Sequence, residues 1–280
     1  METKKYKLTE ETIIVNDKSL YRIEALKNFG NVKKGDKGGF VENESNLSQS
    51  DNCWIYDDAK VYHNAVVYGN AEVYDDAKVY EDARIYGNAR VYGNASIYGD
   101  ASIYGDAKVY GNAWVFGSAQ VYCDAKVYCN AMVYGNAKVY EDARIYGNAK
   151  VYHNAAVCGD AVVYGYVMVF GDAIVYDNAK VYDNAQVSGN AEVFGNAEIR
   201  GDAEIASNSD YIVFKNWWSS GRYFTWTKSN NMWKVGCFYG TGEQLIGKAY
   251  KDSELSGREY EKIVKYVEST LDVTMLTNLK

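Results

Sequence analysis

Histidine and cysteine are the side chains best able to do chemistry near neutral pH, and this chain has few of either. Its two histidines are His63 and His153. One histidine is enough for a general base, whereas a catalytic zinc site takes three protein ligands. We expect free thiols, no metal site and no cofactor, because the five cysteines lack C-x-x-C or other metal-ligand spacing: Cys53, Cys123, Cys129, Cys158 and Cys237.

A six-residue repeat positions both histidines. Valine or isoleucine recurs every six residues from Ile55 to Ile205. Alanine follows four residues later, from Ala59 to Ala203, except at Val167, and Asn or Asp precedes that position, except at Ser118 and Tyr166. Because alternate side chains of a strand share a face, Val and Ala should point inward, and Tyr and the residue before Val outward. The Gly-Asn or Asp-Asn pair between them favours a tight corner.

Each hexad therefore predicts one short strand and one corner. Coils stacked about 4.8 Å apart would bury a continuous core of Val and Ile, with Ala at the narrow corners. Three hexads per coil would make a triangular prism, and two per coil is the alternative. The absence of proline fits this fold, because proline cannot pair on both edges of a strand. The expected fold is all-β, a parallel β-helix of hexapeptide repeats over residues 55–210.

Residues 1–54 predict an N-terminal β cap. Strands are expected at Thr12–Val15 and Leu20–Leu26, followed by a glycine-rich turn at Gly35–Gly39. Such a cap is needed because an open end of the solenoid would expose its core and its unpaired strand edges.

Residues 211–280 predict a small C-terminal α+β module. Strands are expected at Tyr211–Trp218, Arg222–Thr227 and Met232–Tyr239. Two helices should follow, each opened by a capping box, formed by Thr241 with Gln244 and by Ser256 with Glu259. The tryptophans of this module favour a packed core and also allow a recognition surface, for which the candidate residues are Trp217, Trp218, Arg222, Trp226 and Trp233.

The unit V-x-x-N-A-x resembles the repeat of left-handed β-helix proteins, whose best-known members are trimeric acyltransferases. A second resemblance, to the start of YdcK-type bacterial β-solenoids, lies in Gly35-Asp36-Lys37-Gly38-Gly39-Phe40-Val41, Asn46-Leu47-Ser48-Gln49 and Cys53-Trp54-Ile55-Tyr56-Asp57. These resemblances imply a left-handed, three-sided coil and bring an acyltransferase label. Tyr-rich chains with this kind of C-terminal segment look like phage and prophage products.

Acetyl-CoA-dependent acyl transfer is the alternative function that the resemblance implies. Hexapeptide acyltransferases use a histidine near a loop that breaks the repeat, and bind the acyl carrier between subunits. No such loop interrupts residues 55–205. His63 and His153 both occupy a corner, 15 hexads apart, which in a three-hexad coil is five coils or about 24 Å along one edge. We predict that the chain is not an enzyme.

Grouping the hexads in threes assigns the outward residues to faces. One face carries a cationic, aromatic stripe that would suit a protein partner or an anionic ligand, or be a plain solvated ladder: Arg90, Lys108, Lys126, Arg144, Tyr92, Tyr110, Tyr128 and Tyr146. A second face, interrupted by Lys150 and Tyr152, is apolar and favours packing into a dimer or trimer, with a partner surface or an exposed ladder as alternatives: Trp114, Phe116, Met132, Tyr134, Met168 and Phe170.

Charge and hydropathy limit the remaining classes of function. A net charge of −7 argues against a general nucleic-acid binder without excluding nucleic acid. The chain has no apolar stretch of membrane-spanning length and begins with a charged segment, so we expect a cytoplasmic protein, not a membrane protein. We predict a non-catalytic scaffold or interaction protein, phage-encoded, that binds a host macromolecule or an anionic ligand, for example as a host-defence antagonist.

Overall fold

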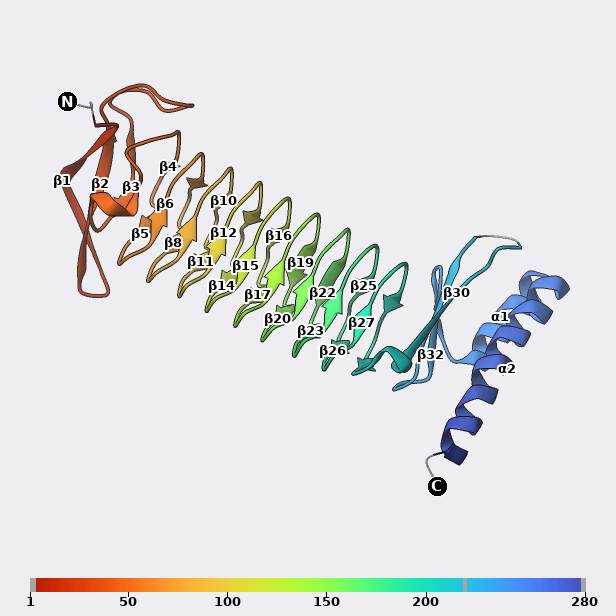
Figure 1. Ribbon diagram of the computed structural model, residues 1–280. Helices are drawn as coiled ribbons and strands as arrows, with labels where there is room; N and C mark the ends of the chain where they lie inside the picture. The colour runs from red at the N-terminus through yellow and green to blue at the C-terminus, as the bar shows by residue number, and fades with distance from the viewer. Residues whose placement is uncertain (1–3, 219–220, 278–280) are drawn as a thin grey trace.

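The chain folds into a three-sided rod with a β-hairpin at one end and a helical module at the other (Figure 1). A computed structural model describes residues 4–218 and 221–277. Strands of the rod pair in parallel with the strand one coil further on, as Arg90–Val91 does with Lys108–Val109. This spacing means three hexads per coil. The parallel solenoid predicted from the sequence is confirmed, and two hexads per coil is ruled out.

Three sheets form the sides of the rod. The first sheet comprises, in spatial order, β1 (Tyr6–Val15), β2 (Lys18–Ala25), β3 (Lys37–Val41), β5 (Lys60–Val61), β8 (Lys78–Val79), β11 (Ser96–Ile97), β14 (Trp114–Val115), β17 (Met132–Val133), β20 (Lys150–Val151), β23 (Met168–Val169), β26 (Gln186–Val187) and β29 (Glu204–Ile205). The second comprises β4 (Trp54–Ile55), β7 (Glu72–Val73), β10 (Arg90–Val91), β13 (Lys108–Val109), β16 (Lys126–Val127), β19 (Arg144–Gly147), β22 (Val162–Gly165), β25 (Lys180–Val181) and β28 (Glu198–Ile199). The third comprises β6 (Val66–Val67), β9 (Arg84–Ile85), β12 (Ser102–Ile103), β15 (Gln120–Val121), β18 (Lys138–Val139), β21 (Ala156–Val157), β24 (Ile174–Val175) and β27 (Glu192–Val193).

The Val, Ile and Ala of the hexads fill the interior of the rod. Every inward-facing Val, Ile and Ala of the hexads from Ile55 to Ile205 is 0% exposed. Burying one valine or isoleucine side chain contributes about 1.5–3 kcal/mol, so strands of two residues are held by stacking rather than by their own length. At the irregular hexad Val167 takes the place of an alanine and is fully buried, while the Tyr166 side chain is 68% exposed.

The corners account for the Gly, Asn and Asp of the repeat. The first corner residue has a positive φ, which is 71° at Gly111 and 61° at Cys129 one coil later. Glycine takes this conformation without strain, whereas other residues cost about 1–2 kcal/mol. His63 and His153 occupy this position at φ 56° and 59°. Their backbone role is therefore that of a corner residue.

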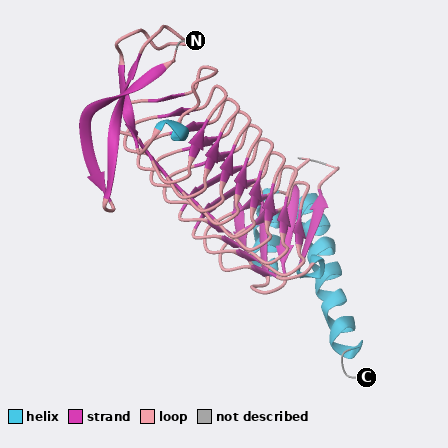
Figure 2. Ribbon diagram, turned by 60° about the vertical axis from the view of Figure 1, so that its left-hand side comes forward, coloured by secondary structure: helices cyan, strands magenta, loops and turns pink. Residues whose placement is uncertain are grey.

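The N-terminal cap is a hairpin of β1 and β2, joined to the first coil through β3 (Figure 2). The glycine-rich turn predicted at Gly35–Gly39 is too long: Gly35 lies in a turn with φ 93°, whereas Gly38 and Gly39 lie inside β3. A Cβ atom on Gly39 would lie 2.5 Å from the carbonyl oxygen of Ala59. Close approach of β3 to the first coil requires these glycines.

The C-terminal module contains four antiparallel strands, not the predicted three: β30 (Tyr211–Lys215), β31 (Tyr223–Thr227), β32 (Met232–Val235) and β33 (Phe238–Gly240). The segment predicted as one strand, Met232–Tyr239, turns back at Gly236, where φ is 54°. Helices α1 (Gly242–Asp252) and α2 (Glu254–Thr277) follow. The sheet and the helices share a core that includes Phe224, Trp233 and Val264.

One of the two predicted helix caps is confirmed. The hydroxyl of Thr241 accepts a hydrogen bond from the Gln244 backbone, and the Gln244 side chain accepts one from the Thr241 backbone. The predicted box at Ser256 is wrong, because α2 already begins at Glu254. Its first turn is held instead by Ser253, whose Oγ accepts from the Ser256 N–H at 3.1 Å.

Candidate binding groove on the second sheet

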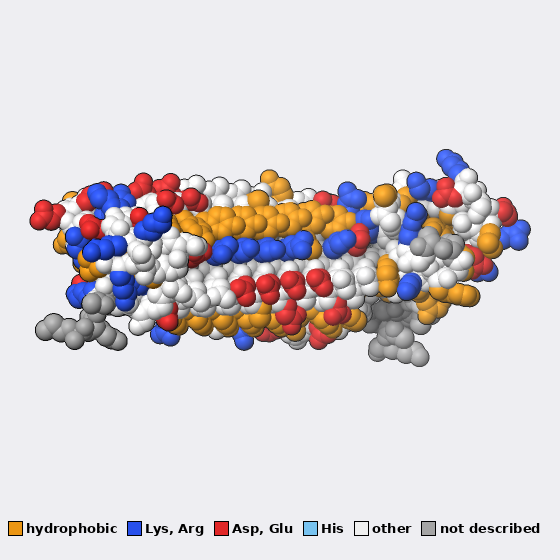
Figure 3. Space-filling view, turned by 90° about the horizontal axis from the view of Figure 1, so that it is seen from above, with side chains coloured by type: hydrophobic (Ala, Val, Ile, Leu, Met, Phe, Trp, Pro, Cys, Tyr) orange, Lys and Arg blue, Asp and Glu red, His pale blue; other side chains and the backbone are white. Residues whose placement is uncertain are grey.

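Four cations form a basic row along the second sheet. Arg90 pairs in register with Lys108, Lys108 with Lys126, and Lys126 with Arg144. Each is the outward residue before a buried Val or Ile, so the strand alternation directs all four away from the core. The space-filling view shows such a row beside a hydrophobic band (Figure 3). The predicted alignment of these residues is confirmed.

The hydrophobic band next to the basic row is a tyrosine ladder, a column of stacked rings one coil apart. Ring centroids are 4.7 Å apart for Tyr92 and Tyr110, and 4.9 Å for Tyr110 and Tyr128 and for Tyr128 and Tyr146. The ring faces are used within the ladder, which leaves ring edges and hydroxyls to meet a ligand. Burial raises the pKa of Tyr110 to about 12, so its hydroxyl is a hydrogen-bond donor at neutral pH.

An acidic row runs parallel to the basic row on its other side (Figure 3). Its members are corner residues one coil apart: Asp106, Asp124, Asp142 and Asp160. The first three line a cavity of about 320 Å³ together with Arg90, Lys108 and Lys126. Arg90 also contacts Glu72, with Nε 3.1 Å from Oε2. Within residues 4–218 and 221–277, Lys108, Lys126 and Arg144 form neither an ion pair nor a side-chain hydrogen bond.

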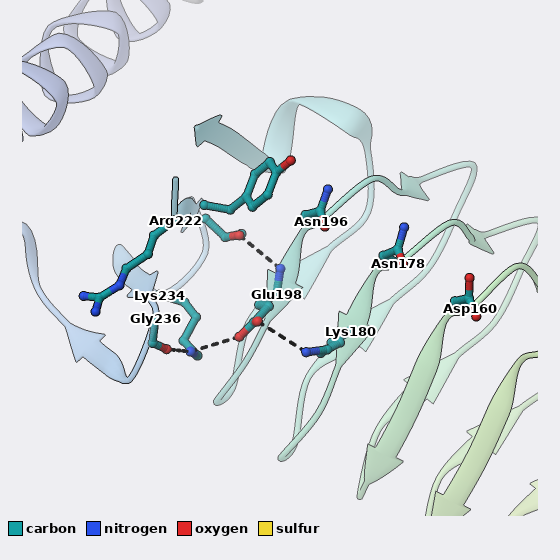
Figure 4. A pocket seen from close by; sticks show the side chains of 10 residues that line it. Asp160, Asn178, Lys180, Asn196, Glu198, Arg222, Lys234 and Gly236 are labelled. Carbon is teal, nitrogen blue, oxygen red and sulfur yellow. Dashed lines mark hydrogen bonds and ion pairs between the residues drawn. The ribbon is translucent and has the colours of Figure 1, made fainter. Parts of the chain in front are cut away.

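The groove ends against the C-terminal module. A cavity of about 300 Å³ lies there, between Asp160, Lys180 and residues of β31 and β32. Glu198 lies between two lysines (Figure 4), 2.9 Å from Lys234 Nζ and 3.7 Å from Lys180 Nζ. Burial acts to raise the pKa of Glu198, but the two lysines outweigh it and hold that pKa below its ordinary value.

The predicted apolar face lies on the first sheet. Trp114 pairs with Met132, and Lys150 separates Met132 from Met168. Their aromatic neighbours belong to that sheet's ladder, in which Phe116 stacks on Tyr134, and Tyr152 on Phe170. Trp114 is 43% exposed. The structure thus brings these residues together, and their use in a dimer or trimer stays a prediction.

The candidate surface residues of the C-terminal module divide into two groups. Trp226 and Trp233 are 2% and 1% exposed, so they belong to the packed core that the sequence favours and are not part of the alternative recognition surface. They pack against each other across β31 and β32 and below α1 and α2. Trp217 is 84% exposed, Arg222 is exposed and Trp218 is half-buried against Tyr260.

The two histidines are not brought together. His63 follows β5 and His153 follows β20, which are five strands apart in the first sheet. Each ring contacts the tyrosine before it, Tyr62 or Tyr152. Over the part of the chain that the structure describes, no three His, Cys, Asp or Glu side chains are placed to hold a metal ion.

Stacked hexads around a common core define the chain as a β-solenoid repeat scaffold. Two segments, 83–99 and 143–159, match the model of the YdcK β-solenoid repeat. These segments lie in the middle of the rod and support the resemblance to YdcK-type solenoids. Among curated proteins, no sequence matches this chain. None of the helices in the described residues is long and apolar enough to cross a membrane.

Proposed function

We propose that the protein is a non-catalytic binding scaffold whose second sheet binds a narrow, linear polyanion along the rod. The observation that carries this proposal is the row of Lys108, Lys126 and Arg144, which have no ionic partner among the described residues. Like charges one coil apart repel one another. A ligand with regularly spaced carboxylates or phosphates would remove that repulsion.

Two features support a polymer over a small anion. The row repeats once per coil, about 4.8 Å, over four coils. An exposed charge pair contributes only about 0.2–1 kcal/mol, so useful affinity needs several contacts on one ligand. The hydroxyls of the second-sheet tyrosine ladder add donors beside each cation.

The acidic row restricts the width of the ligand. A duplex nucleic acid is broad and would place phosphates over Asp106, Asp124 and Asp142, where they are repelled. A single extended chain can lie over the basic row and the tyrosine hydroxyls alone. An acidic polypeptide or a polyuronate has these properties.

Binding of fluorescent poly-L-glutamate to the full chain at low salt tests the proposal. Lys108→Gln with Lys126→Gln should weaken binding by up to about tenfold, because each lost contact contributes about 0.2–1 kcal/mol. The control is Lys78→Gln with Lys138→Gln, which makes the same charge change on the first and third sheets. Equal weakening by both pairs, or no binding at low salt, would contradict the proposal.

The biological setting that we propose is a phage-encoded antagonist that occupies an acidic segment of a host macromolecule. The tyrosine-rich hexads support this setting through their likeness to phage products. Expression in bacteria that carry defence systems should restore phage plating, and Lys108→Gln with Lys126→Gln should abolish the effect. Unchanged phage plating across a panel of such systems would contradict the proposed role as an antagonist, independently of the poly-L-glutamate result.

A further inference from the structure

Each side of the rod carries a ladder of stacked aromatic rings, most of them tyrosines. On the second sheet the rings of Tyr164 and Tyr182 lie 5.1 Å apart with an interplanar angle of 1°. On the third sheet the Tyr104 and Tyr122 rings lie 4.8 Å apart at 0°. The first-sheet ladder is broken, because Phe116 stands between Tyr98 and Tyr134.

We infer that these ladders are sites of oxidative cross-linking, in which neighbouring tyrosines one coil apart couple to dityrosine. Parallel rings stacked one coil apart place an ortho carbon of one phenol beside the same carbon of the next, with ring centroids 4.8 Å apart at Tyr104 and Tyr122. The two rings must tilt toward each other to bring these carbons to bonding distance; most of the rings are half-buried, and Tyr182 is 7% exposed. Each cross-link would join adjacent coils covalently, so the rod could unwind only in larger pieces.

The chemistry balances with hydrogen peroxide as the oxidant and a haem peroxidase as the catalyst. Each of two phenols loses one electron and its hydroxyl proton to give a phenoxyl radical. The two radicals form one carbon–carbon bond between ortho positions. Each ring then regains its hydroxyl when the hydrogen on the coupled carbon moves to oxygen. Two electrons and two protons leave the pair in total, and one peroxide is reduced to two waters.

The stack of Tyr164 and Tyr182 should react early, because a base is already hydrogen-bonded to it. The Tyr182 hydroxyl donates to Glu198 Oε2 at 3.3 Å, so the carboxylate can take the proton as the electron leaves. Tyr74 also donates to a carboxylate, Glu72, at 2.7 Å. Its ring, however, is inclined by 63° to that of Tyr92, which does not present the ortho carbons to each other.

The test treats a dilute mixture of isotopically labelled and unlabelled full-length chains with a haem peroxidase and limiting hydrogen peroxide. Tyrosine cross-links are then located by mass spectrometry of the digested chain. We expect links within one molecule between residues 18 apart, as in the register of the sheets, with Tyr164–Tyr182 prominent. Links without that register, or links mainly between molecules, would overturn the inference. The same enrichment in chain unfolded by urea would do so too.

Two single substitutions act on the ladders in opposite directions. Tyr110→Phe should abolish links from 110 to Tyr92 and Tyr128 while leaving the third-sheet ladder reactive. Phe116→Tyr should create links to Tyr98 and Tyr134, whose rings already stack on Phe116 at 4.8 Å. Failure of Phe116→Tyr to cross-link in a folded chain would overturn the inference. The Phe116→Tyr outcome is independent of polyanion binding, because the first-sheet ladder lies outside the groove.

Discussion

The two ends of the solenoid present opposite hydrogen-bonding groups, because all coils pair in one direction. In each rung the N–H of one coil donates to a carbonyl of the next, as Arg90 does to Ala107 at 2.9 Å. The first coil therefore offers unpaired carbonyl oxygens, and the last coil offers unpaired N–H groups. Unpaired backbone groups are costly when buried and invite edge-to-edge association when exposed.

The N-terminal cap donates hydrogen bonds to the unpaired carbonyl oxygens of the first coil, mostly from its backbone N–H groups. The Phe40 N–H donates to Ala59 O at 2.8 Å, and the Ser48 N–H to Val67 O at 2.9 Å. The side-chain amide of Asn46 donates to Ala65 O at 2.9 Å. Here the chain extends the stack of coils, because β3 pairs in parallel with β5 as another strand of the first sheet.

The C-terminal segment supplies side-chain oxygens that accept hydrogen bonds from the unpaired N–H groups of the last coil. The N–H groups of Glu192, Glu198 and Glu204 are the first donors of the last three strands. They donate to Asn208 Oδ1 at 2.7 Å, Thr225 Oγ1 at 3.0 Å and Ser229 Oγ at 2.7 Å. One end is thus closed by strand continuation and the other by isolated oxygens. Substitutions that add volume should therefore destabilise the N-terminal end. Substitutions that remove a single oxygen atom should destabilise the C-terminal end.

Gly39→Ala should give the largest effect, through the N-terminal cap. The new Cβ would meet both Ala59 O and Ile55 Cγ2 at 2.5 Å, and a backbone oxygen cannot move aside without opening the β3–β5 pairing. Overpacking of this kind costs about 1–3 kcal/mol, and we expect the upper end. Denaturant unfolding, followed by far-UV circular dichroism, would measure it.

Gly247→Ala is the matched control for that substitution. No atom lies within 4 Å of a Cβ built at this exposed helical position. The alanine should stabilise α1 by about 0.5–1 kcal/mol, because glycine is a poor helix former. A similar destabilisation by both substitutions would contradict the close-approach explanation for Gly39.

Thr225→Val should give an intermediate effect, at the other end. Valine has the same shape but no oxygen, so the Glu198 N–H would lose its acceptor. Leaving a buried donor unsatisfied costs about 1–3 kcal/mol. Thr225→Ser keeps the oxygen and should cost less. Hydrogen exchange of the Glu198 amide reports the bond directly, and equal exchange rates in the two variants would refute this role of Thr225.

The repeat was predictable from sequence because the inward Val or Ile and the corner Ala recur in nearly every hexad, so each coil shows the same pattern. The capping contacts were not, because Thr225 and Ser229 are single residues whose partners lie 27 and 25 positions away. Gly39 was assigned to a turn because sequence does not reveal close backbone approach. The basic row follows from the hexad spacing, and the structure shows that Asp106, Asp124 and Asp142 line one groove with it. Trp226 and Trp217 were candidates for the same recognition surface and have opposite burial.

Removing the Glu198 carboxylate should give the smallest effect, at the C-terminal end, and that effect should depend on pH. Because the folded pKa of Glu198 is depressed, its contribution is complete above the ordinary glutamate value, about 4.3, and is lost as pH falls through the folded value. We expect Glu198→Gln to lower the unfolding free energy at pH 7 by no more than about 1 kcal/mol. The difference from the parent chain should vanish in acid. Glu204→Gln, an exposed position at the same end, should leave the pH dependence unchanged. Equal pH profiles for the parent and both variants would show that the contacts of Glu198 with Lys234 and Lys180 do not hold the module to the rod.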